Sequence, residues 1–142
     1  MPVRTDIGST VKTLGNAVVT ISSATTTNFD FGTPNDLDLS SLSTYDHEDR
    51  ILIQFTASTA GTTDTVSFSV QDAADSAGSI GTPATASTSG DALTGGTGNQ
   101  FALVSVNLAP DEPWLRCRVT STGATDTFVT HCSVLAVPAA LL

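Results

Sequence analysis

The sequence predicts an all-β fold, an antiparallel two-sheet sandwich or jelly roll of seven or eight strands. Apolar and hydroxyl-bearing residues alternate in several short runs, as at Ile51, Ile53 and Phe55, so each run has one core face and one wet face. Ser and Thr make up 40 of the 142 residues, and the branched Thr side chain suits a pleated strand. Long-chain helix formers are scarce: two Glu, one Lys and one Met.

The expected elements follow one another along a chain long enough for a single domain with its own core. Residues 1–16 show little periodicity, which predicts an extended N-terminal arm, and residues 17–142 form one β-sandwich domain. Strands are expected at 17–22, 26–31, 50–57, 65–71, 101–108, 114–120 and 128–137.

The connections are predicted from their turn chemistry. Residues 58–64 and 121–126 are small, polar and contain glycine, which is typical of hairpin loops. Residues 37–49 are expected to be a connection that packs its leucines onto one edge of the sandwich. Residues 73–99 are rich in Ala, Ser, Thr and Gly and predict a long loop, within which a short strand at 82–87 is compatible with the pattern.

The alternation also predicts the core. The inward positions are expected to be Ile53, Phe55, Phe68, Val70, Val104, Val106, Leu115 and Val119. Cys117 and Cys132 fall at inward positions too, so buried, reduced thiols are expected; a disulfide would require neighbouring strands of suitable geometry. No companion His-Cys pattern indicates a metal site there.

The charge balance argues against two classes of partner. Fourteen acids face five bases, a net charge of -9, which opposes binding to nucleic acid and to an anionic membrane. The acids either keep a Ser/Thr-rich surface soluble or meet a basic partner. The N-terminus lacks the apolar run of a secretory signal, so the chain is expected to stay in the cytosol or to leave by another route.

Residues 45–50, Tyr-Asp-His-Glu-Asp-Arg, are the one dense cluster of ionisable groups. They lack the alternating acids and glycine of a Ca²⁺ loop, which favours a solvated loop, but a cation at Asp46–Asp49 stays open. His131 is expected on an outer face, and no Ser lies in a nucleophile elbow. We therefore expect no enzyme, no metal and no cofactor.

Four of the five bases are candidate contacts with a partner. Arg116 and Arg118 share the outer face of one predicted strand, where they either pair with acids on a neighbouring strand or bind a partner's carboxylates. Arg4 and Lys12 lie in the predicted arm and are candidate contacts as well.

Four segments between residues 17 and 137 carry a family resemblance. They are the Ser/Thr-rich stretch from Val19 to Asn28-Phe29-Asp30-Phe31-Gly32, the run from Ile51 to Val70 with its trailing Gln71 to Ser76, the run from Gln100 through Pro110 and Pro113 to Trp114-Leu115-Arg116-Cys117-Arg118-Val119, and the final Gly123–Val134 segment. In this order they resemble the small jelly-roll capsid cement (decoration) proteins of tailed bacteriophages.

The resemblance implies a structural protein, made in the host cytoplasm, that sits on the outer capsid surface of the virion. Its partners would be the major capsid protein and itself, as a homotrimer, with no nucleic acid and no membrane. The arm and the 73–99 loop are expected to make many of the contacts. The alternative is a fibre or adhesin module that binds glycans, for which one Trp and one Tyr provide few aromatic platforms.

Overall fold

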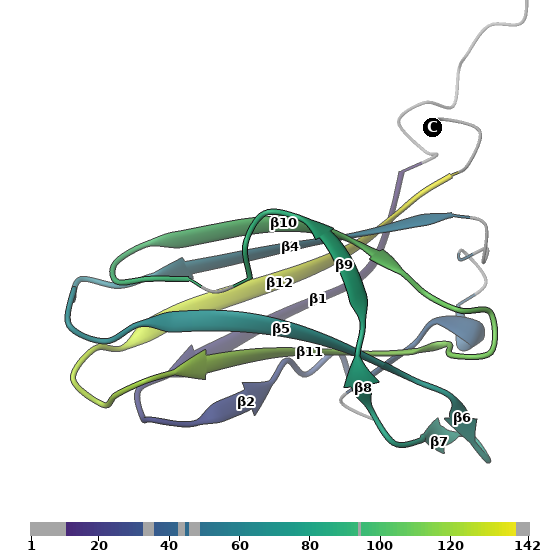
Figure 1. Cartoon of the computed structure of the whole chain (residues 1–142), viewed down its shortest axis with the longest axis horizontal. Helices are drawn as coiled ribbons and strands as arrows, with labels where there is room; N and C mark the ends of the chain where they lie inside the picture. Colours follow the sequence, from purple (N-terminus) through teal and green to yellow (C-terminus); the bar gives the residue numbers. More distant parts are fainter. Residues whose placement is uncertain (1–10, 33–35, 43–44, 46–48, 94, 139–142) are drawn as a thin grey trace, which may run out of the picture.

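The computed structural model describes residues 11–32, 36–42, 45, 49–93 and 95–138, and it confirms the all-β sandwich. Two sheets pack against each other, and every strand pair in the described part is antiparallel. Figure 1 shows the two layers stacked one above the other, with β10, β4, β12 and β1 in one and β5, β11 and β2 in the other.

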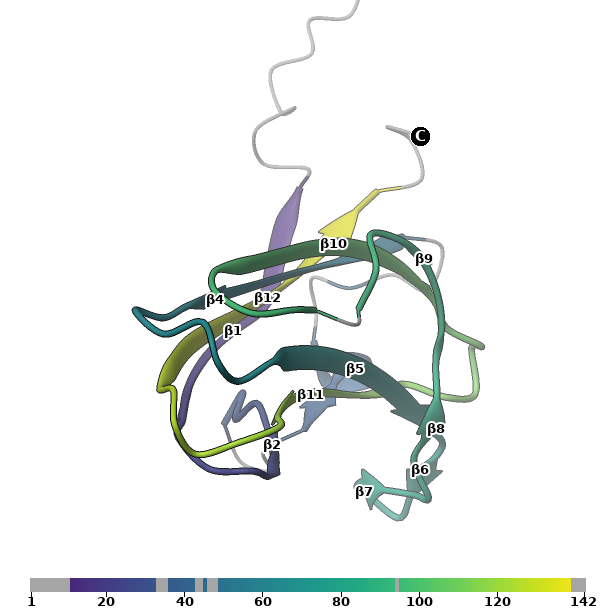
Figure 2. The same cartoon turned by 60° about the vertical axis from the view of Figure 1, so that its left-hand side comes forward.

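Sheet A has five strands. In spatial order these are β1 (Lys12–Ile21), β12 (Phe128–Val137), β4 (Arg50–Ser58), β10 (Gln100–Asn107) and β9 (Ser87–Gly90). Lys12, the first residue of β1, is opposite Ala136, the next-to-last residue of the neighbouring β12, so the two ends of the described chain lie side by side (Figure 2).

Sheet B is built around β11. Its strands are β2 (Thr26–Asn28), β11 (Trp114–Ser121), β5 (Val66–Ala73) and β8 (Ala84–Thr85), with β3 (Leu37–Asp38) also paired to β11. A 3₁₀ turn, η1 (Leu39–Ser41), follows β3, and the Asp38 carboxylate caps it by accepting the Ser40 N–H.

The 73–99 segment has more structure than its composition predicted. It contains a small hairpin of β6 (Asp75–Ser76) and β7 (Ser79–Ile80), and then β8 and β9, which belong to different sheets. Buried Ala86 lies between β8 and β9, and Figure 1 shows this stretch crossing from one layer to the other. The described part of the chain therefore has twelve strands rather than seven or eight, because several pairings involve only two to four residues.

The predicted core is confirmed. All eight expected residues are buried, from Ile53, Phe55, Leu115 and Val119 at 0% exposure to Phe68 and Val106 at 6%. Phe55 stacks on Phe68 with ring centroids 4.7 Å apart, and the tilted Phe29 ring has its centroid 5.9 Å from that of Phe55. Aromatic rings from both sheets thus fill the centre of the sandwich, where they contribute large buried areas.

The two cysteines are buried free thiols, as expected. Cys117 lies on β11 and Cys132 on β12, so the pair meets across the core from opposite sheets. Burial, and then the hydrogen bond with Cys117, raise the pKa of the Cys132 thiol far above its ordinary value. The Cys132 sulfur is therefore a neutral thiol at neutral pH. Both buried cysteines pack as small apolar core residues.

The prediction of two hairpins was wrong. The 58–64 connection joins β4 of sheet A to β5 of sheet B, and the 121–126 connection joins β11 of sheet B to β12 of sheet A. The strands β4 and β5 do not pair with each other. β4 pairs with β10 and β12, and β5 pairs with β11 and β8. Both short polar segments are arches between the layers.

The boundaries near the N-terminus also differ from expectation. Residues 12–16 belong to β1 rather than to an arm, and the strand bulges between Thr13 and Gly15. Of the rest of the predicted arm, Val11 is exposed just before β1, and residues 1–10 lie outside the described residues. In the 37–49 connection, Leu37 and Leu39 are buried and Leu42 packs partly against the core, which confirms that its leucines face the sandwich.

Candidate functional site

The outer face of sheet A is the more unusual of the two sheet surfaces. Four large apolar side chains point outward from it: Val18 and Phe101, each 58% exposed, Leu103 at 39% and Val129 at 38%. The strand register places Val18, His131, Thr56 and Phe101 in one row across β1, β12, β4 and β10. We call this surface, with Val18, Thr56, Phe101, Leu103, Val129 and His131, the apolar face.

No strand of sheet A contains an acid, although the chain carries fourteen acids and a net charge of -9. The bases in these strands are Lys12 and Arg50, which stand where β1 and β4 begin. Exposed apolar side chains on a surface without acidic residues are typical of protein interaction sites. The apolar face is thus the described surface best suited to docking against another protein.

Sequence reasoning did not identify this face. A signal was nevertheless present, because β10 reads Phe101-Ala102-Leu103-Val104 and so has apolar residues at outward as well as inward positions. A strand whose outer face meets water ordinarily alternates apolar with polar residues.

The edges of sheet A differ in how they are covered. The Asp91 carboxylate accepts the Leu103 N–H at 2.9 Å, and the Asp91 N–H donates to the Leu103 carbonyl at 3.0 Å. Asp91 follows the last residue of β9, so it satisfies the backbone groups of Leu103 on β10 where β9 has ended. In the described structure β1 has a strand partner on one side only, and it is ten residues long. A long edge strand is a site where another chain can pair.

The outer face of sheet B settles the question of Arg116. Its guanidinium donates two hydrogen bonds to Asp36, at 2.7 and 2.8 Å, and these bonds raise the pKa of Arg116. Asp36 directly precedes β3, which pairs with β11, so the partner is an acid beside a neighbouring strand. Arg118 instead donates to the Ser69 hydroxyl at 3.1 Å on the adjacent β5. Arg116 is therefore held within the molecule.

The other candidate contacts are less informative. Lys12 lies 4.0 Å from the Asp49 carboxylate, which ties the beginning of β1 to the residue before β4. Arg4 lies outside the described residues. The three described bases of this set do not share one sheet, because Arg116 and Arg118 belong to sheet B and Lys12 to sheet A.

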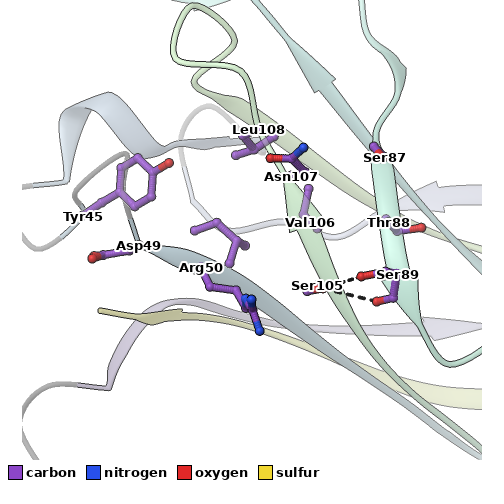
Figure 3. A pocket seen from close by; sticks show the side chains of 11 residues that line it. Tyr45, Asp49, Arg50, Ser87, Thr88, Ser89, Ser105, Val106, Asn107 and Leu108 are labelled. Atoms are coloured by element: carbon purple, nitrogen blue, oxygen red, sulfur yellow. Dashed lines mark hydrogen bonds between the residues drawn. The ribbon is translucent and has the colours of Figure 1, made fainter. Parts of the chain in front are cut away.

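A polar groove of about 570 Å³ opens where β4 begins and β10 ends (Figure 3). Tyr45, Asp49 and Arg50 stand on one side, the β9 strand stands on the other, and β10 side chains lie between them. The complete lining of this groove is Tyr45, Asp49, Arg50, Ile51, Ser87, Thr88, Ser89, Ser105, Val106, Asn107 and Leu108.

Hydrogen bonds fix one wall of the groove. The Ser89 and Ser105 hydroxyls are 2.7 Å apart, and Ser105 also donates to the Ser89 carbonyl at 3.4 Å. The Asp49 side chain is only 6% exposed and faces Lys12. Arg50 is exposed, and within the described residues its guanidinium has no acidic partner.

The predicted cluster at 45–50 falls partly in this groove. Asp46, His47 and Glu48 lie outside the described residues, so the question of a cation there stays open. Elsewhere in the described chain, no group of three or more His, Cys, Asp or Glu side chains is placed to hold a metal ion. His131 is exposed on the outer face of sheet A, as expected.

Compared with known proteins, the chain matches no protein-family model, and no curated protein or solved structure is significantly similar to it. Within the described residues, no helix has the length and apolar character needed to cross a membrane.

Proposed function

We propose that this chain is a capsid cement protein that binds the outer surface of a phage head and stabilises the lattice of major capsid protein. The observation that carries the proposal is the apolar face, where Val18, Phe101, Leu103 and Val129 are exposed on a sheet without acids. The motif resemblance to tailed-phage cement proteins supplies the identity of the partner.

The charge distribution supports docking through sheet A. A molecule with net charge -9 repels other acidic surfaces over most of its area, but the apolar face lacks that repulsion. Burying its exposed apolar side chains against the capsid provides the driving force for binding. The acids then remain on the surfaces that face solvent.

The edge strand β1 supports self-association into a homotrimer. Among the described strands β1 pairs with β12 alone, so its other edge, on the strand that carries Val18, is open to another strand. Pairing of this edge with a neighbouring copy would cover it, as closed oligomers do. A ligand that binds only assembled lattice stabilises that lattice by mass action.

The test uses capsids assembled without this chain. Purified protein should sediment with them and raise their disruption temperature, and analytical ultracentrifugation should show a trimer. A Val18→Ser/Phe101→Ser double variant, with its fold checked by circular dichroism, should lose both effects. If the wild-type protein neither sediments with capsids nor protects them from heat, the proposal is wrong.

A further inference from the structure

His131 stands in the middle of the apolar face. It lies on β12 opposite Val18 of β1 and Thr56 of β4, and Phe101 of β10 continues the row. Its side chain is exposed on the outer surface of sheet A. Histidine is the side chain that ordinarily changes its charge between about pH 5 and pH 8. The face proposed for docking therefore contains a group that can gain a positive charge in mildly acidic solution.

The side chains around His131 are uncharged. The strands that flank β12 are β1 and β4, and the residues they place opposite His131, Val18 and Thr56, carry no ionisable group. The outward neighbours on β12 itself are Val129 and Ser133. At the next outward positions of the flanking strands there are only amides and hydroxyls, at Asn16, Thr20, Gln54 and Ser58. None of these described neighbours can balance a charge on the imidazole.

The charged groups of the surrounding described elements lie at the ends and edge of sheet A. Lys12 and Arg50 are opposite positions five and six residues further along β12, which is roughly 16–20 Å away at the rise of a strand. Asp91 lies beyond β10, two strands from β12, and its carboxylate accepts a backbone N–H. Beyond the other end of β12, the buried Asp64 and Asp126 carboxylates accept backbone N–H groups of the two arches.

We infer that protonation of His131 weakens docking through the apolar face, so that the chain binds its partner at neutral pH and releases it in mildly acidic solution. This inference rests on the capsid docking proposed above. A covered imidazolium would lose its hydration and find no acid on the strands of sheet A, whereas a covered neutral imidazole loses much less. A partner acid opposite His131 is disfavoured, because a chain of net charge -9 repels it.

The direction of the pH effect follows from proton linkage. If the free chain binds a proton at His131 and the docked chain does not, affinity is complete above the pKa of the free histidine. Affinity then falls as the pH drops below that pKa, by about a factor of ten for each pH unit.

The experiment measures capsid binding by sedimentation of the full chain at about pH 7.5 and about pH 5.5, on either side of the usual histidine titration. Between these conditions the wild type should lose about tenfold more affinity than His131→Gln, which cannot gain the charge. His47→Gln alters the other of the two histidines and should lose as much as the wild type. Groups that titrate on the capsid are common to all three proteins, so the comparison isolates His131.

A permanently charged variant tests the same inference without a change of pH. His131→Lys, with its fold checked by circular dichroism, should bind at neutral pH about as weakly as the wild type does in the acidic buffer. Wild-type affinity in this variant would overturn the inference, as would an equal pH dependence in wild type and His131→Gln; both results leave capsid docking itself intact. A wild-type chain that binds capsids at neither pH would overturn the proposed function and this inference together.

Discussion

Asp64 and Asp126 each accept hydrogen bonds from the backbone of the loop that contains the other. One Asp64 carboxylate oxygen accepts the N–H groups of Thr125 and Asp126, both at 2.7 Å, and one Asp126 oxygen accepts those of Thr63 and Asp64, at 2.7 and 2.9 Å. The surrounding sequence repeats, since residues 61–66 read GTTDTV and residues 123–128 read GATDTF. The repeat joins the two arches that cross between the sheets.

We predict that Asp64→Ala and Asp126→Ala each destabilise the protein by about 2–4 kcal/mol, because each leaves one buried and one part-buried N–H group without its acceptor. The double variant should cost less than the sum, since either change already loosens the shared structure. Urea unfolding curves measure all three free energies. If the losses of unfolding free energy in the two single variants add up to that of the double variant, the two carboxylates do not support one shared structure.

The glycines of the repeat provide a separate test. A Cβ at Gly61 would collide with the Asp126 carboxylate, and one at Gly123 with that of Asp64, whereas a Cβ at Gly96 would meet nothing closer than 3.7 Å. Gly61→Ala and Gly123→Ala should therefore lower the thermal midpoint, and Gly96→Ala should leave it nearly unchanged. Equal midpoints for all three variants would mean that the two arches are not packed against each other as described.

An inward and an outward phenylalanine should differ in how much their loss lowers the free energy of unfolding. Phe68→Ala should destabilise by about 3–5 kcal/mol, because it removes a buried ring stacked on Phe55. Phe101→Ala, at a position 58% exposed, should change stability by about 0.5 kcal/mol or less. Chemical denaturation of the isolated protein measures both; a reversed order would place the core on the wrong face of the strands.

Thiol reactivity tests the core contact between Cys117 and Cys132. Both are buried, and burial raises the pKa of Cys132, so an alkylating reagent should label neither in the folded protein. After unfolding without reductant, intact-mass analysis should show both labelled. Two unlabelled cysteines in the unfolded chain would instead indicate a disulfide across the sandwich.

The contact between Trp114 and Asp75 predicts a pH dependence. The indole N–H donates to the Asp75 carboxylate at 2.9 Å, and this bond, with a second from the Gly78 N–H, holds the pKa of Asp75 below its usual 3.8. A carboxyl whose pKa is lower in the folded state stabilises the fold above its unfolded pKa, and the effect is lost as pH falls through the folded pKa. The stability difference between wild type and Asp75→Asn should therefore shrink below pH 3.8. A difference that stays constant from neutral to acid pH would contradict this.

The period-two pattern was sufficient to predict the fold class and every core residue tested, because burial of one strand face is a local property. Strand pairing was not predictable in the same way. A short polar loop with a glycine at position 61 or 123 is equally compatible with a hairpin and with an arch, and long-range packing decides between them. The hydrogen bonds of the Asp64 and Asp126 carboxylates that connect the two arches join residues about sixty positions apart.

The candidate sites were harder to predict from the sequence, because they too depend on which strands lie next to each other. A charge pair for Arg116 was one of two predicted alternatives, but its partner Asp36 depended on β3 pairing with β11. The polar groove joins three distant segments, so no spacing in the sequence indicates it. The apolar face depends on which strands lie next to each other, although the outward Phe101 and Leu103 were visible in the pattern.

The most direct test of the central claim compares a charge placed on either sheet. Thr56→Glu puts an acid in the middle of the apolar face, between His131 and Phe101, and Ser67→Glu puts one on an outward, half-buried position of β5 in sheet B. Capsid binding by sedimentation should fall at least about tenfold for Thr56→Glu, because the charge would lose its hydration in the interface. Ser67→Glu should bind as wild type does. Wild-type binding by a folded Thr56→Glu variant, or loss confined to Ser67→Glu, would contradict docking through sheet A.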